Sequence, residues 1–350
     1  MTDSYGVVSG WVFGNDGYMG TAITKRGNKK LTWETTSEFN IGLDLGFFDN
    51  RISLSMEYYN RIISDLLVSN KSLPAYNEIN TIAANIGKTQ GRGFELTLST
   101  VNIMNKDWTW STDFTFYTFK DNWYERDPNW KPAAYESKKD PIRSYYSYVS
   151  DGLLQVGEKA PAWQPTLVPG QIKLKNLYDT GTSPNVLDQY DKVNLGSQDP
   201  KCTLGLNNTL RYKNLDFNIY FYGEIGRLRG ASYYDAWIVG FGNSLTNVSQ
   251  QSLHSYTNAN QNTTVPNLIE SAYDFGDYYH KKINYLRCRN ITLGYTIPVS
   301  KSIANSVRIS ANVSNPFVFT NWNGVDPETD TGNFSYPNVT SFSFGIDISF

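Results

Sequence analysis

The chain ends in SFSFGIDISF, residues 341–350. Apolar side chains occupy every second position of this stretch: Phe342, Phe344, Ile346, Ile348 and Phe350. A period of two predicts a β-strand with one apolar face and one polar face. Chain ends usually fray unless they are tied down. A strand that persists to the last residue must therefore be paired, and its apolar face must meet an apolar environment.

The same alternation recurs along the whole chain. Further segments with this pattern lie at about 5–13, 39–47, 52–58, 94–98, 108–116, 204–210, 215–221, 291–297 and 307–313. Outside the loops, no segment shows convincing helical periodicity. We therefore predict an all-β antiparallel protein with about ten strands, most of them about ten residues long or longer.

The connections between these segments alternate between short and long. The short ones are 49–50, about 102–107, 213–214 and about 298–305, and the long ones are about 15–34, 65–84, 121–199, 227–281 and 320–335. Hairpin loops of soluble barrels and sandwiches are mostly about 2–5 residues long, whereas outer-membrane barrels combine short periplasmic turns with long extracellular loops. The pattern favours a transmembrane β-barrel whose C-terminus lies on the periplasmic side, with a secreted β-sandwich as the alternative.

A barrel in lipid cannot leave a strand edge free, because hydrocarbon does not satisfy unpaired backbone groups. We therefore expect the C-terminal strand to close against the first strand, and to be the segment that the barrel assembly machinery engages. Its Phe and Ile side chains would face the acyl chains of the outer-membrane lipid. Phe350, together with Trp108, Tyr58 and Tyr295 near other strand ends, matches the aromatic girdle of such barrels.

The composition excludes several classes of protein. The net charge is −2 with both signs mixed, so the basic footprint of a nucleic-acid binder is missing. No apolar run approaches the roughly 20 residues of a membrane-spanning helix, and the N-terminus has no secretory signal pattern. Cys202 and Cys288 fall on opposite strand faces by alternation, so we do not predict a disulfide. With only two histidines in the chain, a His/Cys metal centre is not expected.

No group of residues predicts catalysis. The sequence lacks a GxSxG motif and a phosphate-binding glycine loop. The acidic residues Asp326, Glu328 and Asp330 lie in GVDPETDTG, which we interpret as a turn of solvated acids, since catalytic carboxylate pairs need one group in a dry site. We therefore predict a protein that is not an enzyme and binds no cofactor.

The long loops are rich in aromatic residues. The candidates for ligand or partner contact are Tyr145, Tyr146 and Tyr148 in the longest loop and Tyr233, Tyr234 and Trp237 in the next. Their flat rings can stack on sugars or peptide side chains while their polar tips stay hydrogen-bonded. The alternative is that these rings pack loop on loop or lie at the headgroup belt.

Eight stretches, taken in order, resemble segments of one protein family. They are NKKLTWETTSEFNIGLDLGFFDNRISLSMEYYNRIISDLL (28–67), NIGKTQGRGFELTLS (85–99), SYVSDGLLQ (147–155), PGQIKLKNL (169–177), LGSQDPKCTLGLNNTLRYKNLDFNIYFYG (195–223), YLRCRNITLGYTIP (285–298), NPFVFTNWNGVDPET (315–329) and YPNVTSFSFGIDISF (336–350). The family is the SusC/RagA family of TonB-linked outer-membrane proteins. Arg92 and Phe94 stand at less usual positions, but the ordered set covers nearly the whole chain.

The resemblance implies that residues 1–350 are the C-terminal portion of a larger receptor of about 22 strands. The signal peptide, the TonB-contacting segment and the plug would belong to a missing N-terminal region. The resemblance further implies import of oligosaccharides or peptides across the outer membrane of a Gram-negative bacterium. TonB would supply the energy, and a SusD-like lipoprotein would cap the extracellular loops. A complete ten-stranded barrel, or an adhesive glycan-binding β-protein without a transport role, is the alternative.

One departure concerns a loop that can look like a calcium site in the family. Asn176, Tyr178 and Thr180 stand at its ligand positions before Gly181. Asn176 is neutral and Tyr178 is not a calcium ligand, whereas a calcium loop needs several carboxylate oxygens. We expect a turn here and no bound metal.

Overall fold

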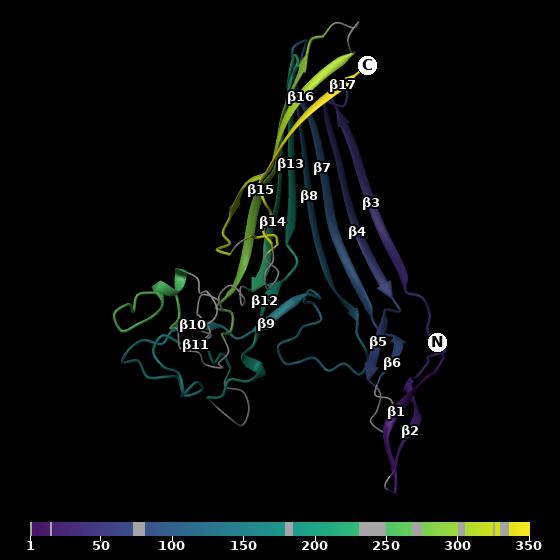
Figure 1. Cartoon of the computed structure of the whole chain (residues 1–350), viewed down its shortest axis with the longest axis vertical. Helices are drawn as coiled ribbons and strands as arrows, with labels where there is room; N and C mark the ends of the chain where they lie inside the picture. The colour runs from purple at the N-terminus through teal and green to yellow at the C-terminus, as the bar shows by residue number, and fades with distance from the viewer. Residues whose placement is uncertain are drawn as a thin grey trace. The chain divides into compact units, whose positions relative to one another are not determined.

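The computed structural model describes residues 2–14, 16–72, 81–178, 185–230, 250–267, 275–299, 305–324, 326–329 and 336–350. Its main element is a nine-stranded antiparallel sheet in the order β17-β16-β15-β14-β13-β8-β7-β4-β3 (Figure 1). The strands are β3 (Thr35–Phe47), β4 (Ile52–Ser64), β7 (Lys88–Met104), β8 (Trp108–Glu125), β13 (Cys202–Tyr212), β14 (Leu215–Gly230), β15 (His280–Ile297), β16 (Ser306–Thr320) and β17 (Ser341–Ser349). The predicted all-β antiparallel class is confirmed.

The first predicted strand, at about 5–13, lies outside the main sheet. β1 (Ser4–Phe13) pairs with β2 (Asp16–Lys25) in a separate two-stranded hairpin, so the connection predicted at about 15–34 contains a strand. Gly14 has a φ of 67°, a left-handed conformation that glycine adopts without strain and that suits a tight reversal between the two strands. Nine of the ten predicted strands therefore lie in the main sheet.

The register confirms that the sheet has an apolar face. Tyr212 pairs with Leu215, Leu215 with Tyr295, Tyr295 with Ile309, and Ile309 with Ile346, so one row of large apolar side chains crosses five strands. All five side chains are exposed. An apolar row exposed across five neighbouring strands is typical of a surface that contacts lipid or another apolar partner.

The opposite face of the same strands is polar. Thr209, Asn218, Thr292, Asn312 and Ser343 form one row across β13 to β17. Asn218 donates from Nδ2 to the Thr209 hydroxyl at 3.0 Å, and Thr292 donates to Asn312 Oδ1 at 2.9 Å. Their side chains thus form a hydrogen-bonded polar surface instead of a packed core.

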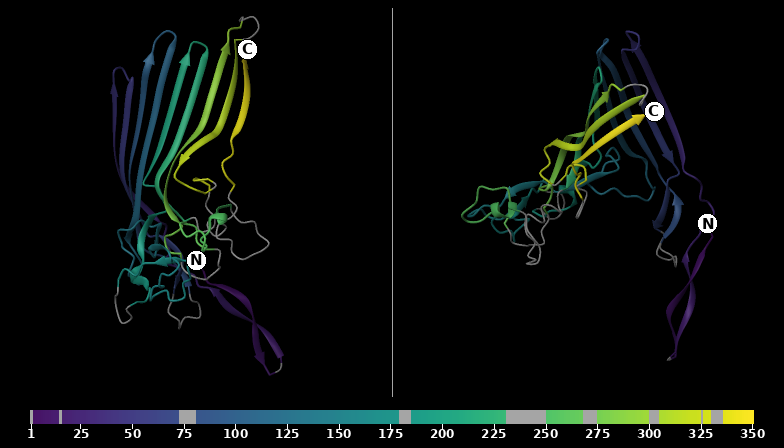
Figure 2. Two further views of the ribbon diagram at one scale, coloured as in Figure 1. Left: turned by 90° about the vertical axis from the view of Figure 1, so that its left-hand side faces the viewer. Right: turned by 45° about the horizontal axis from the view of Figure 1, so that its top comes forward.

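The short turns lie together at one end of the sheet, which Figure 2 shows as the end that also holds the C-terminus. The turn between β3 and β4 uses three consecutive left-handed residues, Phe48, Asp49 and Asn50, with φ of 54°, 55° and 62°. Lys213 has a φ of 50° in the turn between β13 and β14 and donates its N–H to the carbonyl of Asp107, in the turn between β7 and β8. The predicted asymmetry of short and long connections is confirmed for these described turns.

The C-terminal strand β17 pairs with β16 along its whole length, up to Ser349 opposite Ser306. Its alternate apolar residues are highly exposed: Phe342 70%, Phe344 84%, Ile346 70%, Ile348 52% and Phe350 87%. Within the described residues β17 has one neighbour, so its other edge is unpaired here. Closure against the first strand stays a prediction.

The two longest connections form a folded layer that we call the loop lobe, residues 144–178, 185–197, 250–267 and 275–280. It contains β9 (Ser144–Ser147), β10 (Ser150–Leu153), β11 (Ile172–Leu174), η1 (Gln189–Asp191), β12 (Val193–Ser197) and η2 (Gln250–His254). Its core is Leu153, Ile172, Leu174 and Tyr256, all at most 6% exposed. The lobe is therefore a packed structure in its own right.

Another group of residues packs separately, comprising Met1–Asn40, Tyr59–Arg92 and Asp121–Lys131. It contains the β1–β2 hairpin and a second hairpin, β5 (Leu67–Ser72) with β6 (Thr81–Asn85). Among the residues that the structure describes, no helix is long and apolar enough to span a membrane. Cys202 and Cys288 are both free thiols, in agreement with the prediction that they do not pair.

Candidate functional site

A β-bulge turns two arginines of β15 onto the polar face of the sheet. Tyr295, on the apolar face, lies opposite Leu215, but Arg287, also an odd-numbered residue, lies opposite Tyr222 on the polar face. The register shifts between Cys288 and Asn290, so Arg289 is the extra residue. Bulges re-aim side chains in this way. Without it, Arg287 and Arg289 would lie on the apolar face.

The two arginines bind the acidic loop between β16 and β17. Arg287 contacts Asp326 Oδ2 at 2.9 Å and Glu328 Oε1 at 2.8 Å, and Arg289 contacts Glu328 Oε2 at 2.8 Å. The Arg287 and Asp326 side chains are each only 4% exposed. The expectation of a solvated acidic turn is therefore wrong for Asp326 and Glu328, while Asp330 lies outside the described residues. The reason is the bulge, which places two cations under the turn.

Backbone groups complete the binding of Asp326. Its Oδ1 accepts N–H groups from Glu328 at 2.8 Å and Thr329 at 3.3 Å, and its Oδ2 accepts the N–H of Asn338 at 3.0 Å. Burial alone would raise the pKa of Asp326, but these N–H groups and the Arg287 guanidinium outweigh it and hold the pKa below its usual range. Asp326 therefore stays charged when buried. We call Arg287, Arg289, Asp326 and Glu328 the ionic clamp.

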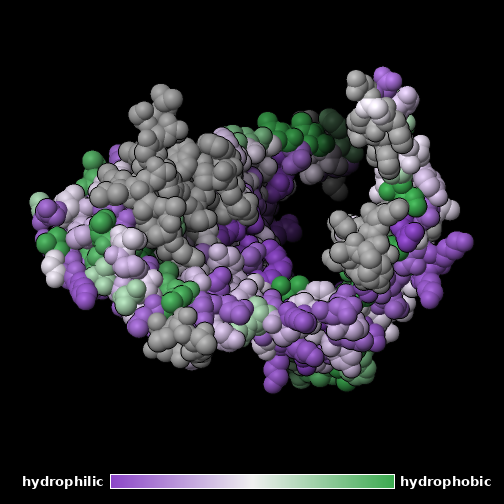
Figure 3. Space-filling model, turned by 90° about the horizontal axis from the view of Figure 1, so that it is seen from below, coloured by the Kyte–Doolittle hydropathy of each residue, from purple (hydrophilic) through white to green (hydrophobic). Residues whose placement is uncertain are grey.

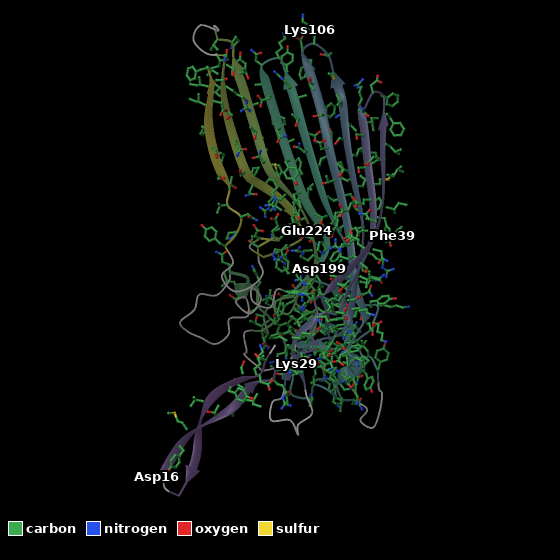
Figure 4. The ribbon with its side chains drawn as sticks, turned by 90° about the vertical axis from the view of Figure 1, so that its right-hand side faces the viewer. Asp16, Lys29, Phe39, Lys106, Asp199 and Glu224 are labelled. Atoms are coloured by element: carbon green, nitrogen blue, oxygen red, sulfur yellow. The ribbon has the colours of Figure 1, made fainter. Side chains whose placement is uncertain are left out.

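A second ion pair lies beside the clamp on β14. Glu224 Oε1 accepts from Arg227 Nη2 at 2.9 Å and from the Tyr222 hydroxyl at 3.1 Å. The Arg289 guanidinium lies over the Tyr222 ring, 5.1 Å from its centre. Figure 4 shows Glu224 where the strands pass into the loops, far from Lys106 at the turn end. The clamp therefore belongs to the loop end of the sheet.

The loop lobe positions the first group of predicted contact residues. Tyr146 donates its hydroxyl to Asp140 Oδ2 at 2.7 Å and packs on Tyr135, with ring centres 5.1 Å apart. Burial and this bond to a carboxylate raise the pKa of Tyr146. Tyr148 packs against the lobe core and lies under the Lys192 ammonium. Tyr148 thus packs within the loop lobe, and Tyr146 packs against Tyr135 and Asp140, which precede it in the same connection.

Tyr145 is the most exposed of the three tyrosines, at 38%. Its ring stacks on the His280 imidazole, with centres 4.3 Å apart and planes 27° apart. A ring supported on one face and exposed at the surface suits stacking on a ligand. The other candidates, Tyr233, Tyr234 and Trp237, lie outside the described residues. Seen from the loop end, hydrophilic residues predominate on the described surface (Figure 3).

Asp191 organises the stretch that was compared with a calcium loop. Its Oδ1 accepts the N–H groups of Leu177 and Tyr178 at 2.7 and 3.0 Å, and its Oδ2 accepts the N–H of Asp188 at 3.0 Å. The Asp191 side chain is fully buried, so its oxygens bind backbone groups. Within the described ranges, no three His, Cys, Asp or Glu residues are grouped as a metal site would require. Thr180 lies outside those ranges.

A family model described as "TonB dependent receptor-like, beta-barrel" matches residues 3–315. The chain belongs to this TonB-dependent receptor family. The TonB-dependent receptor P3 of Formosa agariphila is 29% identical over 97% of this chain, and the TonB-dependent receptor SusC of Bacteroides thetaiotaomicron is 27% identical over 96%. These matches cover 36% and 34% of the relatives, so the chain spans about a third of their length.

Solved structures show the same fold. The RagAB peptide transporter matches 99% of this chain and 38% of its own, with 24% identity and a TM-score of 0.76. The RagAB peptide importer in its "open-open" state matches with a TM-score of 0.78 and 22% identity. The resemblance to SusC/RagA receptors is confirmed, and so is the barrel fold of this TonB-dependent receptor chain.

The ionic clamp was missed by reasoning from the sequence. In the barrel fold of this TonB-dependent receptor family, the apolar face meets lipid and the polar face lines the lumen. The clamp therefore lies on the lumen side. A signal was present: YLRCRNITLGYTI carries Arg287 and Arg289 in phase with Ile291, Leu293 and Tyr295. Two arginines in phase with lipid-facing residues are costly, and they indicate a bulge between the two halves of the strand.

Proposed function

We propose that this chain is the C-terminal barrel portion of an outer-membrane importer that takes up oligosaccharides with energy from TonB. The observation that carries the proposal is the two-faced sheet, with an exposed apolar row across five strands and a hydrogen-bonded polar row behind it. Such a sheet suits a barrel wall between lipid and a wet passage. Membership of the TonB-dependent receptor family supports the direction and energy source.

The polar row supports an uncharged, hydroxyl-rich cargo. It consists of Thr, Asn and Ser side chains, which can donate and accept hydrogen bonds without favouring either sign of charge. Two charged residues on this face, Arg308 and Asp216, form an ion pair with contacts of 3.1 and 2.6 Å. A neutral oligosaccharide matches this surface better than a charged peptide does. Peptide import, suggested by likeness to RagAB, is the second candidate.

A capping lipoprotein of the SusD type is part of the proposal. The loop lobe has its own buried core and is therefore able to present a fixed surface to a partner. Among the predicted contact residues that the structure describes, Tyr145, stacked on His280, is the one best placed to contact a ligand or that lipoprotein. Tyr146, Tyr148, Tyr233, Tyr234 and Trp237 remain proposed contacts. The missing N-terminal region would contact TonB.

The test is a deletion of the complete receptor gene in its own host, with complementation. Uptake of fluorescently labelled neutral oligosaccharides and of labelled peptides would be measured in parallel. Loss of oligosaccharide uptake, restored by the gene, is the expected result. Loss of peptide uptake alone would favour the second candidate. Unchanged uptake of both, with reduced adhesion to glycan-coated surfaces, would favour a non-transporting adhesive protein.

A further inference from the structure

The connection between β16 and β17 is tied back over β14 and β15. We call Asp326, Pro327, Glu328 and Thr329 the strap. The strap binds Arg287 and Arg289 through its carboxylates, and Arg229 donates to the carbonyl of Glu328 at 3.1 Å. In Figure 1 this connection, drawn in yellow-green, lies beside β14 and β15. The connection thus passes from β16 inward over two neighbouring strands before β17 begins.

The strap is held at more than one point. Asn338, which precedes β17, donates its N–H to Asp326 Oδ2 at 3.0 Å and its side-chain amide to Glu328 Oε2 at 3.1 Å. On the side of β16, Asn321 accepts the N–H of Asn284 at 2.8 Å and donates to the Lys282 carbonyl at 3.1 Å. Both ends of the described connection are therefore fixed to β15 or to the strap itself.

The charges decide whether the strap stays in place. Asp326 and Glu328 have side chains 4% and 10% exposed. Buried carboxylates need a charged or hydrogen-bonding partner, and removing the partner leaves an uncompensated charge that favours escape to water. Arg287 serves both carboxylates and Arg289 serves Glu328, so the two arginines together hold the strap on the lumen face.

We infer that Arg287 and Arg289 are positioning residues that hold the strap in the lumen and thereby limit the length of oligomer that the receptor imports. The inference rests on the proposed transport function. A strap docked on the lumen face takes up space through which cargo would pass, whereas a released strap leaves that space to the ligand. The arginines therefore act on size selectivity through the strap, without having to touch the cargo.

The test uses the full-length receptor with Arg287→Met and Arg289→Met together, which removes the charge and keeps an unbranched side chain. Glu-C protease on intact cells reports strap release by cleavage after Glu328. Cleavage should be at least about tenfold faster in the variant, because it follows the population of the open form. The control is Lys173→Met, which breaks the Lys173–Glu158 ion pair in the loop lobe and leaves the strap untouched.

The second readout is the ratio of uptake rates for long and short members of two labelled series, neutral malto-oligosaccharides and peptides of graded length. The ratio should rise severalfold in the variant and stay unchanged in the control. Faster cleavage with an unchanged ratio would overturn the inference, and so would wild-type cleavage. If the wild type imports neither series, the transport proposal fails. The protease result still shows whether the two arginines hold the strap in place.

Two further variants keep the test usable if the double Arg→Met variant does not assemble into a barrel. Arg289→Met alone keeps the buried Arg287 and should give a smaller increase in both readouts, since Arg289 is 33% exposed. Glu328→Gln removes the charge that both arginines bind and keeps the length of the side chain, so it should also raise the uptake ratio. An unchanged ratio in Glu328→Gln would mean that charge pairing does not hold the strap.

Discussion

Single residues on the lumen face are fixed by contacts that cross more than one strand. Arg308 on β16 reaches over Gly294 on β15 to bind Asp216 on β14. A Cβ at Gly294 would clash with Arg308 Nη2 and would lie 2.6 Å from Asp216 Oδ1. The ion pair that passes above this position therefore favours glycine, because a larger residue would displace the ends of both side chains.

Gly294→Ala should displace the Arg308 guanidinium from Asp216 and destabilise the barrel by up to about 1 kcal/mol, because the two side chains are one-third exposed and solvent screens the pair. The measurement is resistance to heat or urea, read by gel mobility of the full-length receptor. The matched control is Gly42→Ala on β3, where the nearest atom to an added Cβ is 3.8 Å away. Equal loss of resistance in both variants would contradict the account.

The ionic clamp makes a prediction about pH. The pKa of Asp326 is lower in the folded protein than in the unfolded chain. Its contribution to stability is therefore complete above the usual Asp pKa of about 4 and is lost as the pH falls through the lowered value. The backbone N–H groups of Glu328 and Thr329 donate hydrogen bonds to Asp326. Hydrogen–deuterium exchange should show that these N–H groups are protected and that the protection is lost only in strongly acidic solution. In Asp326→Asn, that pH-dependent step should disappear; its persistence would assign the step to another group.

At the scale of elements, alternation was a sound guide to which residues share a face. It predicted the nine strands of the main sheet and the lipid-facing row. It did not predict the partner of β1, because alternation within one segment shows which residues share a face but does not show which strand lies next to it. It also failed at Arg289, which is the extra residue of the β-bulge. An inserted residue reverses the faces of the residues beyond it, and the sequence reveals this only where charged side chains, such as Arg287, occupy positions that alternation assigns to the apolar face.

The loop lobe shows a second limit of the sequence. Its strands are only three to five residues long, and their pairing depends on segments far apart in the chain. The aromatic residues of this region were correctly noted as a group. Which of them pack and which lie at the surface depended on partners such as Asp140 and His280, which no local pattern indicates.

The C-terminal strand allows the two faces to be tested against each other. Phe344→Arg or Ile346→Arg should cost about 2–4 kcal/mol where the side chain meets the bilayer core. Ser343→Asn and Asp347→Asn, on the lumen face of the same strand, should cost far less. Unfolding of the full-length receptor in lipid vesicles measures both sets. Similar losses for both would mean that the assignment of the faces is wrong.

The proposed ligand contact is tested within the loop lobe. Tyr145→Ala removes the ring that stacks on His280 and should reduce ligand capture by roughly 1 kcal/mol or more, as loss of an aromatic stacking partner does. Tyr145→Phe keeps the ring and should keep the affinity. Binding to the purified full-length receptor is the measurement. If Tyr145→Ala binds the ligand with wild-type affinity, Tyr145 does not contact the ligand and only packs against His280.

In the proposed barrel, the two ends of the sheet lie on opposite sides of the outer membrane. The turn that contains Lys106 lies at one end, and the loop lobe that contains Lys159 follows the other end of the strands. Both lysines are exposed, so a label can reach each of them wherever solvent can.

The most direct test of this topology is cysteine labelling of the full-length receptor, made otherwise cysteine-free, in living cells. Lys159→Cys and Lys106→Cys would each be treated with a maleimide that does not cross membranes. We expect Lys159→Cys to be labelled on intact cells, and Lys106→Cys to be labelled only after the outer membrane is opened. Labelling of Lys106→Cys on intact cells, or failure to label Lys159→Cys there, would contradict a barrel with long extracellular loops and short periplasmic turns.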